Sequence, residues 1–406
     1  MLRQVSKVLV RQSVRNFSLT HQLACSSYQQ KKLFTPGPLN TSMVVKQAML
    51  KDLGSRDAAF LKVVRSIRQQ LVEIAGGDLN DYTCVPIQGT GTYAVESVFQ
   101  CAIAKNEKRD VLILENGAYG KRMAKICQVL NIPHQTMSFS EDSMVDPVKV
   151  KEAVKNNQYS MVAVVHSETS SGVINPIDEI GKVLQELGPQ RPIYFIDAMS
   201  SFGAFEMSVK DSPIDFLVSS ANKCLEGVPG FSYVIARLDS LKQCKGNSRS
   251  LCLDIYDQWL GLEQNSQFRF TPPTHAMLAF AKALEEFNSE GGIEGRRKKY
   301  MTNRSILRDG MKDLGFEEYL KPPVMTEDSY IITSYRYPND PNFDFATLYK
   351  KLSERNFVIY PGKVLDSDCF RVGSIGHLNA NDFIDFIKAL QAVLEDMKVS
   401  LPVKYD

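Results

Sequence analysis

The chain has 406 residues, of which 44% are hydrophobic and 23% charged, and its formal net charge is +2 at pH 7. This length allows two domains and a large core, and the composition is that of an ordinary soluble globular protein. The small net charge gives no reason to expect a nucleic-acid or membrane-surface partner. No apolar run approaches the roughly 18 residues that a membrane-spanning helix needs.

Cysteine and histidine are spread along the chain. The eight cysteines form no CxxC pair, and the five histidines show no metal-ligand spacing. We therefore expect reduced thiols, as in a reducing compartment, and no metal site.

The first 30 residues are basic and amphipathic. Four cationic side chains recur every four positions from Arg3 to Arg15, and the first acid of the chain is Asp52. A segment that contains Arg and Ser but no acid is typical of a mitochondrial transit peptide, and the residues before and after Phe17 resemble a matrix-processing site. This pattern predicts a targeting leader over residues 1–30 and a mitochondrial matrix location; a disordered basic tail is the alternative.

Mature structure is expected to begin near Lys32. The stretch Thr35–Pro38 (TPGP) has too many helix and strand breakers for a regular element, so we expect an extended arm or loop. After Asp57, apolar residues recur with helical spacing until Gly76-Gly77, which predicts an amphipathic helix that ends there.

Apolar runs then alternate with amphipathic helical patterns. Strands buried on both faces that alternate with helices indicate an α/β domain with a mostly parallel sheet. Ligands of such sheets bind beyond the carboxyl ends of the strands. The expected strands are 111–114, 161–165, 193–196, 216–218 and 233–235, and the expected helices include 92–104, 121–130 and 177–187.

The segment Gln88–Thr92 (QGTGT) stands before one of these helices. Glycines let the backbone approach a ligand closely, and a helix N-terminus favours an anion, so this loop predicts a phosphate site. It matches neither GxxxxGK[ST] nor GxGxxG, which argues against a nucleotide. The alternative is a tight turn with a threonine helix cap.

Two more loops follow expected strands. Asn116–Gly120 (NGAYG) places Tyr119 at a strand end, where its ring could lie on a planar ligand or pack over the sheet. His166–Gly172 (HSETSSG) offers hydroxyls for a phenolic oxygen, or a helix-capping turn. We expect His166 to be buried and hydrogen-bonded.

An acid and a lysine follow two consecutive expected strands. Asp197 ends one strand, and Lys223 follows the next. A pyridoxal phosphate (PLP) enzyme needs a lysine for its Schiff base and an acid at the pyridinium nitrogen. By themselves the two residues are better explained by a turn or helix cap and a solvated side chain.

After Gly291-Gly292 the pattern changes. Expected helices at 296–308, 345–355 and from 381 alternate with expected strands at 330–335, 357–360 and 369–373. We therefore predict a large domain over residues 31–290, which includes the arm, and a smaller α+β domain over residues 291–406.

The order of these motifs resembles that of the fold-type-I PLP-dependent transferases. Over essentially all of its mature length, the chain resembles class V aminotransferases. The segments that carry the resemblance are Thr35–Leu39, Gly89–Glu96, Asn116–Gly120, Asp197–Gly203, Ala221–Gly230, Phe270–His275 and Phe370–Gly376.

The resemblance implies a role for each matching residue. Lys223 would form the Schiff base with PLP and move the substrate proton, and Asp197 would keep the pyridinium nitrogen cationic. Arg371 would hold the substrate carboxylate bidentately, with Gly37 and Pro38 in the pocket wall. The other cofactor contacts would be Thr90, Gly91, Thr92, Tyr119, Thr169, Met199 and Asn222, with Thr271 contributed by the second subunit of a homodimer.

The resemblance also implies the activity, which is transfer of the amino group of 2-aminoethylphosphonate to pyruvate. An alanine–glyoxylate or serine–pyruvate aminotransferase is the alternative, although those relatives commonly carry Trp where this chain has Tyr119. A dinucleotide-binding oxidoreductase would show a GxGxxG turn, and a catalytically inactive PLP-fold protein would not need both Asp197 and Lys223. Cys224 is expected to be structural.

Overall fold

The computed structural model describes residues 30–361 and 368–405. Its larger part is built on a seven-stranded sheet, in which all neighbouring strands run parallel except β10, which runs against both of its neighbours. In sheet order the strands are β2 (Tyr82–Gln88), β10 (Phe231–Arg237), β9 (Phe216–Ser220), β8 (Ile193–Asp197), β5 (Met161–Val165), β3 (Val111–Glu115) and β4 (His134–Ser138).

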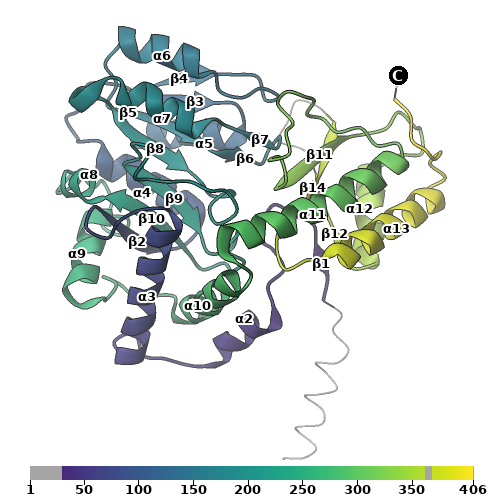
Figure 1. The fold of residues 1–406 in the computed structure, drawn as a ribbon, viewed down its shortest axis with the longest axis horizontal. Coiled ribbons are helices and arrows are strands. Elements are labelled where there is room, and N and C mark those ends of the chain that lie inside the picture. Colours follow the sequence, from purple (N-terminus) through teal and green to yellow (C-terminus); the bar gives the residue numbers. More distant parts are fainter. Residues whose placement is uncertain (1–29, 362–367, 406) are drawn as a thin grey trace, which may run out of the picture.

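Helices lie against both faces of this sheet (Figure 1). The expected α/β class with a mostly parallel central sheet is confirmed, because the inner strands are buried along nearly their whole length. The helices of this part are α2 (Met43–Gln47), α3 (Ala58–Ile74), α4 (Gly91–Ala102), α5 (Ala118–Val129), α6 (Pro147–Asn156), α7 (Ile177–Gln185), α8 (Leu238–Lys242), α9 (Ile255–Asn265) and α10 (Thr274–Ser289), with short 3-10 turns at Ala48–Leu50 and Gly188–Gln190.

A second hydrophobic core lies at the other end of the molecule, on the right in Figure 1. Its largest members are aromatic side chains, among them Phe34, Phe370 and Phe386. The elements that build it are α11 (Gly292–Asp313), β11 (Ile332–Arg336), α12 (Phe345–Glu354), β12 (Phe357–Val358), β13 (Tyr360–Pro361), β14 (Cys369–Gly373) and α13 (Ala380–Asp396).

The N-terminal arm and α11 join the two parts. Strand β1 (Lys32–Leu33) pairs with β12 in parallel, and Phe34 is fully buried in the second core. The first turns of α11 pack on the larger core through Tyr300, whereas Leu307 packs in the second core. We propose that the chain divides near residue 291. The N-terminal arm precedes the larger part in sequence but packs against the smaller one.

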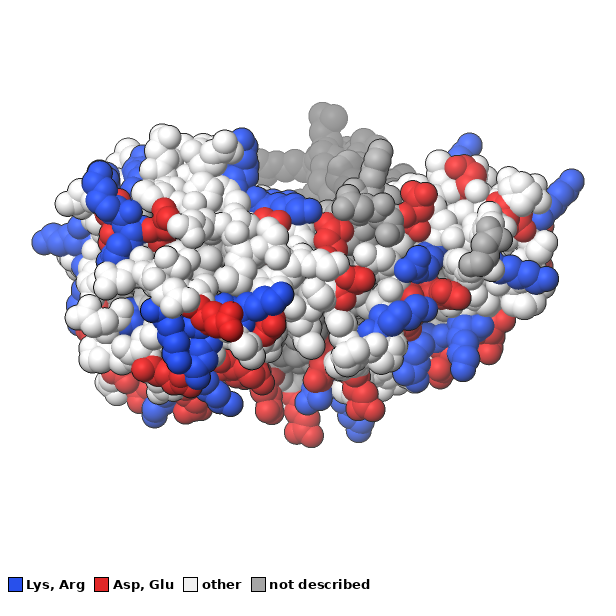
Figure 2. All heavy atoms as spheres, turned by 90° about the horizontal axis from the view of Figure 1, so that it is seen from above, with Lys and Arg blue, Asp and Glu red and all other residues white. Residues whose placement is uncertain are grey.

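Charge is mixed over the molecular surface. On the face in Figure 2, Lys and Arg side chains alternate with Asp and Glu side chains, in keeping with the net charge of +2. Within residues 30–361 and 368–405, no helix is both long enough and apolar enough to cross a membrane.

Asp215 lies just before β9, at the amino ends of the parallel strands, whereas Asp197 lies at their carboxyl ends. The Asp215 carboxylate is 4% exposed and accepts hydrogen bonds from Arg191 Nη1 at 2.6 Å, from the Tyr194 amide at 2.8 Å and from Ser240 Oγ at 2.7 Å. Replacing it leaves these donors, including a half-buried guanidinium, without their acceptor. We expect Asp215→Ala to lower the free energy of unfolding by about 3–5 kcal/mol.

Urea unfolding of the purified protein measures this loss. The matched control is Asp239→Ala, which removes an exposed carboxylate paired only with Lys242 at 3.2 Å and should change the free energy by less than about 1 kcal/mol. Equal effects of the two substitutions would contradict the role given to Asp215.

Candidate active site

A cavity of about 630 Å³ opens at the carboxyl ends of the parallel strands, a volume typical of sites for small ligands. Of the residues singled out in the sequence, ten line it: Gly37, Pro38, Thr90, Gly91, Thr92, Tyr119, Asp197, Met199, Asn222 and Lys223. These come from five separate segments, which the fold brings together at the carboxyl ends of the parallel strands.

The QGTGT loop connects β2 to α4. Gly89 has φ +128°, which favours glycine, and Thr90 is the N-cap residue of α4. The Thr90 side chain makes no capping hydrogen bond, so its hydroxyl is not used in the way the helix-cap alternative supposed. The first amides of α4 point their positive dipole end at the cavity, an arrangement that suits an anion.

Lys223 reaches the cavity from the turn after β9. Its Nζ donates to the carbonyl of Pro36 at 2.5 Å, so the N-terminal arm covers the amine. The arm must carry glycine there, because a Cβ on Gly37 would lie 2.6 Å from Nζ and its φ is +134°. Burial lowers the pKa of Lys223 to about 8, which the Asp197 carboxylate opposes and the cations of Arg371 and Arg122 reinforce. At pH 7 about a tenth of the amine is therefore uncharged.

Asp197 is the last residue of β8 and is 5% exposed. Its Oδ1 accepts the Met199 amide at 2.9 Å, which fixes the carboxylate toward the cavity. Burial raises the pKa of Asp197 to about 6, although this hydrogen bond and the charges of Lys223 and Arg122 oppose the change. A cationic ring nitrogen in the cavity would supply the partner that a buried carboxylate needs.

Tyr119 lies at the start of α5 with its ring at the cavity wall. One helical turn later, Arg122 places its guanidinium 4.8 Å from the Tyr119 ring centroid and 3.4 Å from Thr92 Oγ1. Sequence reasoning missed Arg122. Its position three residues after an aromatic strand-end residue was a usable signal, because residues at i and i+3 share a helix face.

The hydroxyl-rich turn after β5 is buried. Ser167 and Thr169 belong to it, and their hydroxyl oxygens have no hydrogen-bond partner in the described part of the chain. Glu168 is fully buried, and burial raises its pKa, while hydrogen bonds from Ser170 and from the Tyr119 amide oppose the change. Ser167 lines the cavity and was also missed.

The three other candidates, Thr169, Thr271 and Arg371, are not among the residues that line the cavity. Arg371, in the middle of β14, is 6% exposed and donates from Nη1 to the Thr169 carbonyl at 2.8 Å, so it borders the hydroxyl-rich turn. Thr271 lies on the surface between α9 and α10, and the neighbouring Phe270 ring is 51% exposed. A single copy of the chain does not bring Thr271 to the cavity.

His166 and Cys224 lie behind the site. His166 shares a 2.9 Å hydrogen bond with Ser201 Oγ, and burial lowers its pKa to about 4, which keeps the ring neutral. Cys224 is fully buried, and burial raises the pKa of its thiol to about 12. Within the described residues, no group of three His, Cys, Asp or Glu side chains could hold a metal ion.

Comparison with known proteins agrees with this geometry. The family model of Aminotransferase class-V matches residues 44–354. The chain belongs to the class-V aminotransferase family. It is 46% identical over 370 residues to the 2-aminoethylphosphonate–pyruvate transaminase of Salmonella heidelberg, covering 90% of this chain and 98% of that protein, and equally identical over 366 residues to that of Salmonella paratyphi B.

Solved structures of the family share the fold. A ureidoglycine–glyoxylate aminotransferase from Bacillus subtilis superposes with a TM-score of 0.82 over 92% of this chain and 95% of that one, at 20% identity. A pyridoxamine–pyruvate aminotransferase from Mesorhizobium loti gives a TM-score of 0.81 at 21% identity, covering 92% and 95% of the two chains. The fold-type-I aminotransferase architecture is thereby confirmed.

One expectation from the sequence is wrong. The relatives at 46% identity come from Salmonella, a bacterium, which has no mitochondria. This finding contradicts a mitochondrial matrix location. The basic pattern on which that location rested falls on residues 1–29, which lie outside the described residues.

Because the pKa of Asp197 is raised, the free energy of unfolding of the cofactor-free protein should depend on pH. Between the ordinary carboxyl value of 3.8 and about 6, the folded chain holds this proton more tightly than the unfolded chain. The free energy of unfolding should therefore fall by about 3 kcal/mol as the pH rises through this window.

Asp197→Asn should remove this contribution and flatten the curve. Urea unfolding of the cofactor-free protein at pH values from 4 to 7 measures it. Asp313→Asn, at an exposed position in α11, is the control and should keep the slope. An unchanged slope in Asp197→Asn would show that the carboxylate titrates normally.

Proposed function

We propose that this chain is a PLP-dependent aminotransferase that uses 2-aminoethylphosphonate as amino donor and pyruvate as acceptor, giving phosphonoacetaldehyde and L-alanine. The observation that carries the cofactor assignment is the meeting of Lys223, Asp197 and the QGTGT loop in one cavity. The substrate assignment is supported by the identity of 46% over nearly the whole length of transaminases with this named activity.

The residues present fit PLP. The cofactor would bring an anionic phosphate to the α4 N-terminus, a cationic ring nitrogen to Asp197 and a phenolic oxygen to the unpartnered hydroxyls of Ser167 and Thr169. Tyr119 and Met199 would contact the ring, and Asn222 would join Thr90, Gly91 and Thr92 at the phosphate. When bound, PLP supplies an aldehyde carbon for an amine and a ring that accepts electrons.

The chain's own residues would then bind the substrate and move its proton. The Lys223 amine, with a pKa of about 8, is poised to take a proton from the substrate carbon that bears the nitrogen and to return it during the second half of the reaction. The Pro36 carbonyl orients Nζ through the 2.5 Å hydrogen bond. Arg371 would grip the carboxylate of pyruvate or alanine, and Gly37 and Pro38 would exclude water from that side.

A homodimer belongs to the same proposal. Thr271 and Phe270 are exposed and do not line the cavity of their own chain, so a threonine contact to the cofactor would come from a second copy. The alternative of an alanine–glyoxylate activity receives no support from a Nostoc structure of that name, because a TM-score of 0.80 at 22% identity shows the fold alone.

Lys223→Ala should abolish the visible absorption band that PLP gives when bonded to a lysine. Turnover should fall by about 10²–10⁴-fold, the usual contribution of a positioned acid or base. Absorption spectra of the purified protein with added PLP, together with alanine formation, measure both effects. Lys242→Ala changes an exposed lysine and should leave both unchanged. A persistent band in Lys223→Ala would disprove the assignment.

A panel of amino donors tests the substrate. We expect pyruvate-dependent alanine formation with 2-aminoethylphosphonate to exceed that with serine by at least about 100-fold in kcat/KM, since a site built for a charged group rejects analogues that leave its polar groups unpaired. Efficient use of serine without turnover of the phosphonate would overturn the donor while leaving the cofactor assignment intact.

A further inference from the structure

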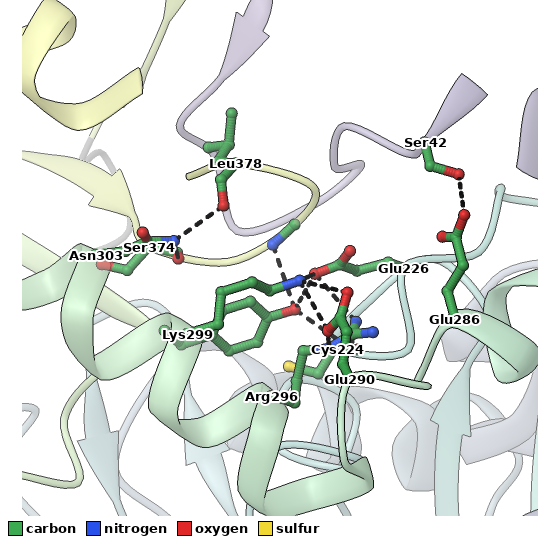
Figure 3. Close-up of polar contacts among 12 residues, drawn as sticks. Ser42, Cys224, Glu226, Glu286, Glu290, Arg296, Lys299, Asn303, Ser374 and Leu378 are labelled. Atoms are coloured by element: carbon green, nitrogen blue, oxygen red, sulfur yellow. Dashed lines mark hydrogen bonds and ion pairs between the residues drawn. The ribbon is translucent and has the colours of Figure 1, made fainter. Parts of the chain in front are cut away.

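The turn that carries Lys223 rests on a buried network of charged and polar side chains (Figure 3). The Glu226 amide donates to the Lys223 carbonyl at 2.7 Å, and Glu226 itself has φ +57°, a left-handed conformation that is unusual for a residue with a side chain. Such a conformation persists only where the surrounding contacts enforce it.

The Glu226 carboxylate supplies those contacts. It is 2% exposed, and its Oε1 lies 3.0 Å from Arg296 Nη1 and 2.8 Å from Lys299 Nζ. Glu290 completes an electrically balanced set by pairing with Arg296 at 2.9 Å. Arg296, which is 1% exposed, also donates to the Cys224 carbonyl at 2.6 Å. The backbone that follows Lys223 is thereby held by the first turns of α11.

Tyr300 connects this network to the smaller part of the molecule. Its hydroxyl, fully buried, donates to Glu226 Oε1 at 2.7 Å and accepts the Gly376 amide at 3.3 Å. One turn further along α11, Asn303 Nδ2 donates to the carbonyls of Ser374 and Leu378 at 3.2 and 3.3 Å. Because Arg296, Tyr300 and Asn303 recur at i, i+4 and i+7, one face of α11 contacts both segments.

The segment that Tyr300 and Asn303 hold begins two residues after Arg371. It spans residues 373–378 and begins with the last residue of β14, whose amide donates to the Phe34 carbonyl at 3.0 Å. A Cβ on Gly373 would lie 2.5 Å from the Thr35 carbonyl oxygen, so this segment is in close contact with the arm. The next residue of the arm, Pro36, accepts the Lys223 amine.

Two routes therefore join Lys223 to segment 373–378. The first runs from the lysine backbone through Glu226 and Tyr300, and the second from the lysine amine through Pro36 and the arm. We propose that Tyr300 is a positioning residue that couples carboxylate binding at Arg371 to the protonation of the Lys223 amine. The proposal rests on the function proposed above and adds a residue that does not touch the cavity.

Several charged or titratable groups around the Lys223 amine influence its protonation. They are Asp197 from β8, Arg122 from α5, Arg371 from β14 and the adjacent Cys224 thiol. A bound carboxylate offsets the charge of Arg371 and draws on the strand that leads into segment 373–378. The loss of the Arg371 charge favours the protonated form of the lysine nitrogen. The second effect would reach the backbone of Lys223 through Tyr300, and its size is what the test measures.

The test is a pH titration of the visible absorption of the PLP-loaded protein, with and without saturating oxamate, an unreactive carboxylate of pyruvate's shape. In the wild type, we expect oxamate to raise the apparent pKa of the band by about one unit, a tenfold coupling within the usual range. By reciprocity, oxamate should bind about tenfold more tightly to the protonated form.

Tyr300→Phe keeps the ring and removes the hydroxyl's hydrogen bonds to Glu226, Cys224 and Gly376. We expect the oxamate-induced shift to fall below half of its wild-type size, and a shift of half or more would overturn the proposal. Tyr82→Phe is the matched control, because it also removes a buried hydroxyl, one that donates to the Val209 carbonyl at 2.5 Å at the opposite edge of the sheet. It should keep the full shift.

Asn303→Ala provides an independent variant should Tyr300→Phe fold poorly. It frees the carbonyls of Ser374 and Leu378 and should also reduce the shift below half. A wild-type band that titrates but ignores oxamate would overturn the coupling alone. Absence of any lysine-dependent band would instead refute the proposed function, so the two failures are distinguishable.

Discussion

The structure depends on a constraint at the carboxyl edge of the sheet, where an acid and an amine are both buried. Strands β8 and β9 are hydrogen-bonded neighbours in parallel register, with Asp197 opposite Val218. Parallel pairing requires a crossover between them, and the turn after β9 then delivers Lys223 to the edge where β8 ends. Each of the two charges favours the ionised form of the other, and desolvation opposes both. This balance leaves both groups within reach of neutral pH, which suits acid–base chemistry.

The features that sequence predicted well are those with a local signal. Inner strands such as β5 and β14 lie at the residues expected, because continuous apolar runs bounded by polar turns need no distant information. Ten of the thirteen candidate site residues line one cavity, because the topology of an α/β sheet places strand ends together whatever their spacing in the chain. The roles of these residues stay predictions.

The strands that were not expected are the two at the edges of the sheet. β4 has the sequence HQTMS and is largely exposed, and β2 contains Pro86. Edge strands of this kind are polar or carry proline, since only one side must be hydrogen-bonded, and so they lose the apolar signature of a strand. The reversed direction of β10 was equally hidden, because an apolar run does not report its orientation.

Contacts between residues far apart in the sequence could not be predicted, and these contacts determine much of the geometry of the site. Nothing in the sequence around Thr35–Pro38 indicates that the Pro36 carbonyl accepts a hydrogen bond from the Lys223 amine. Nor does it indicate that Phe34 packs against Phe383 and Phe386, which lie about 350 residues later in the chain. The arm is held between the smaller core and the lysine, so its position depends on both parts at once. The segments that carry Arg371 and Lys223 therefore share one mechanical support. A change in how the smaller part packs should alter the reactivity of the amine even where every residue of the cavity is retained.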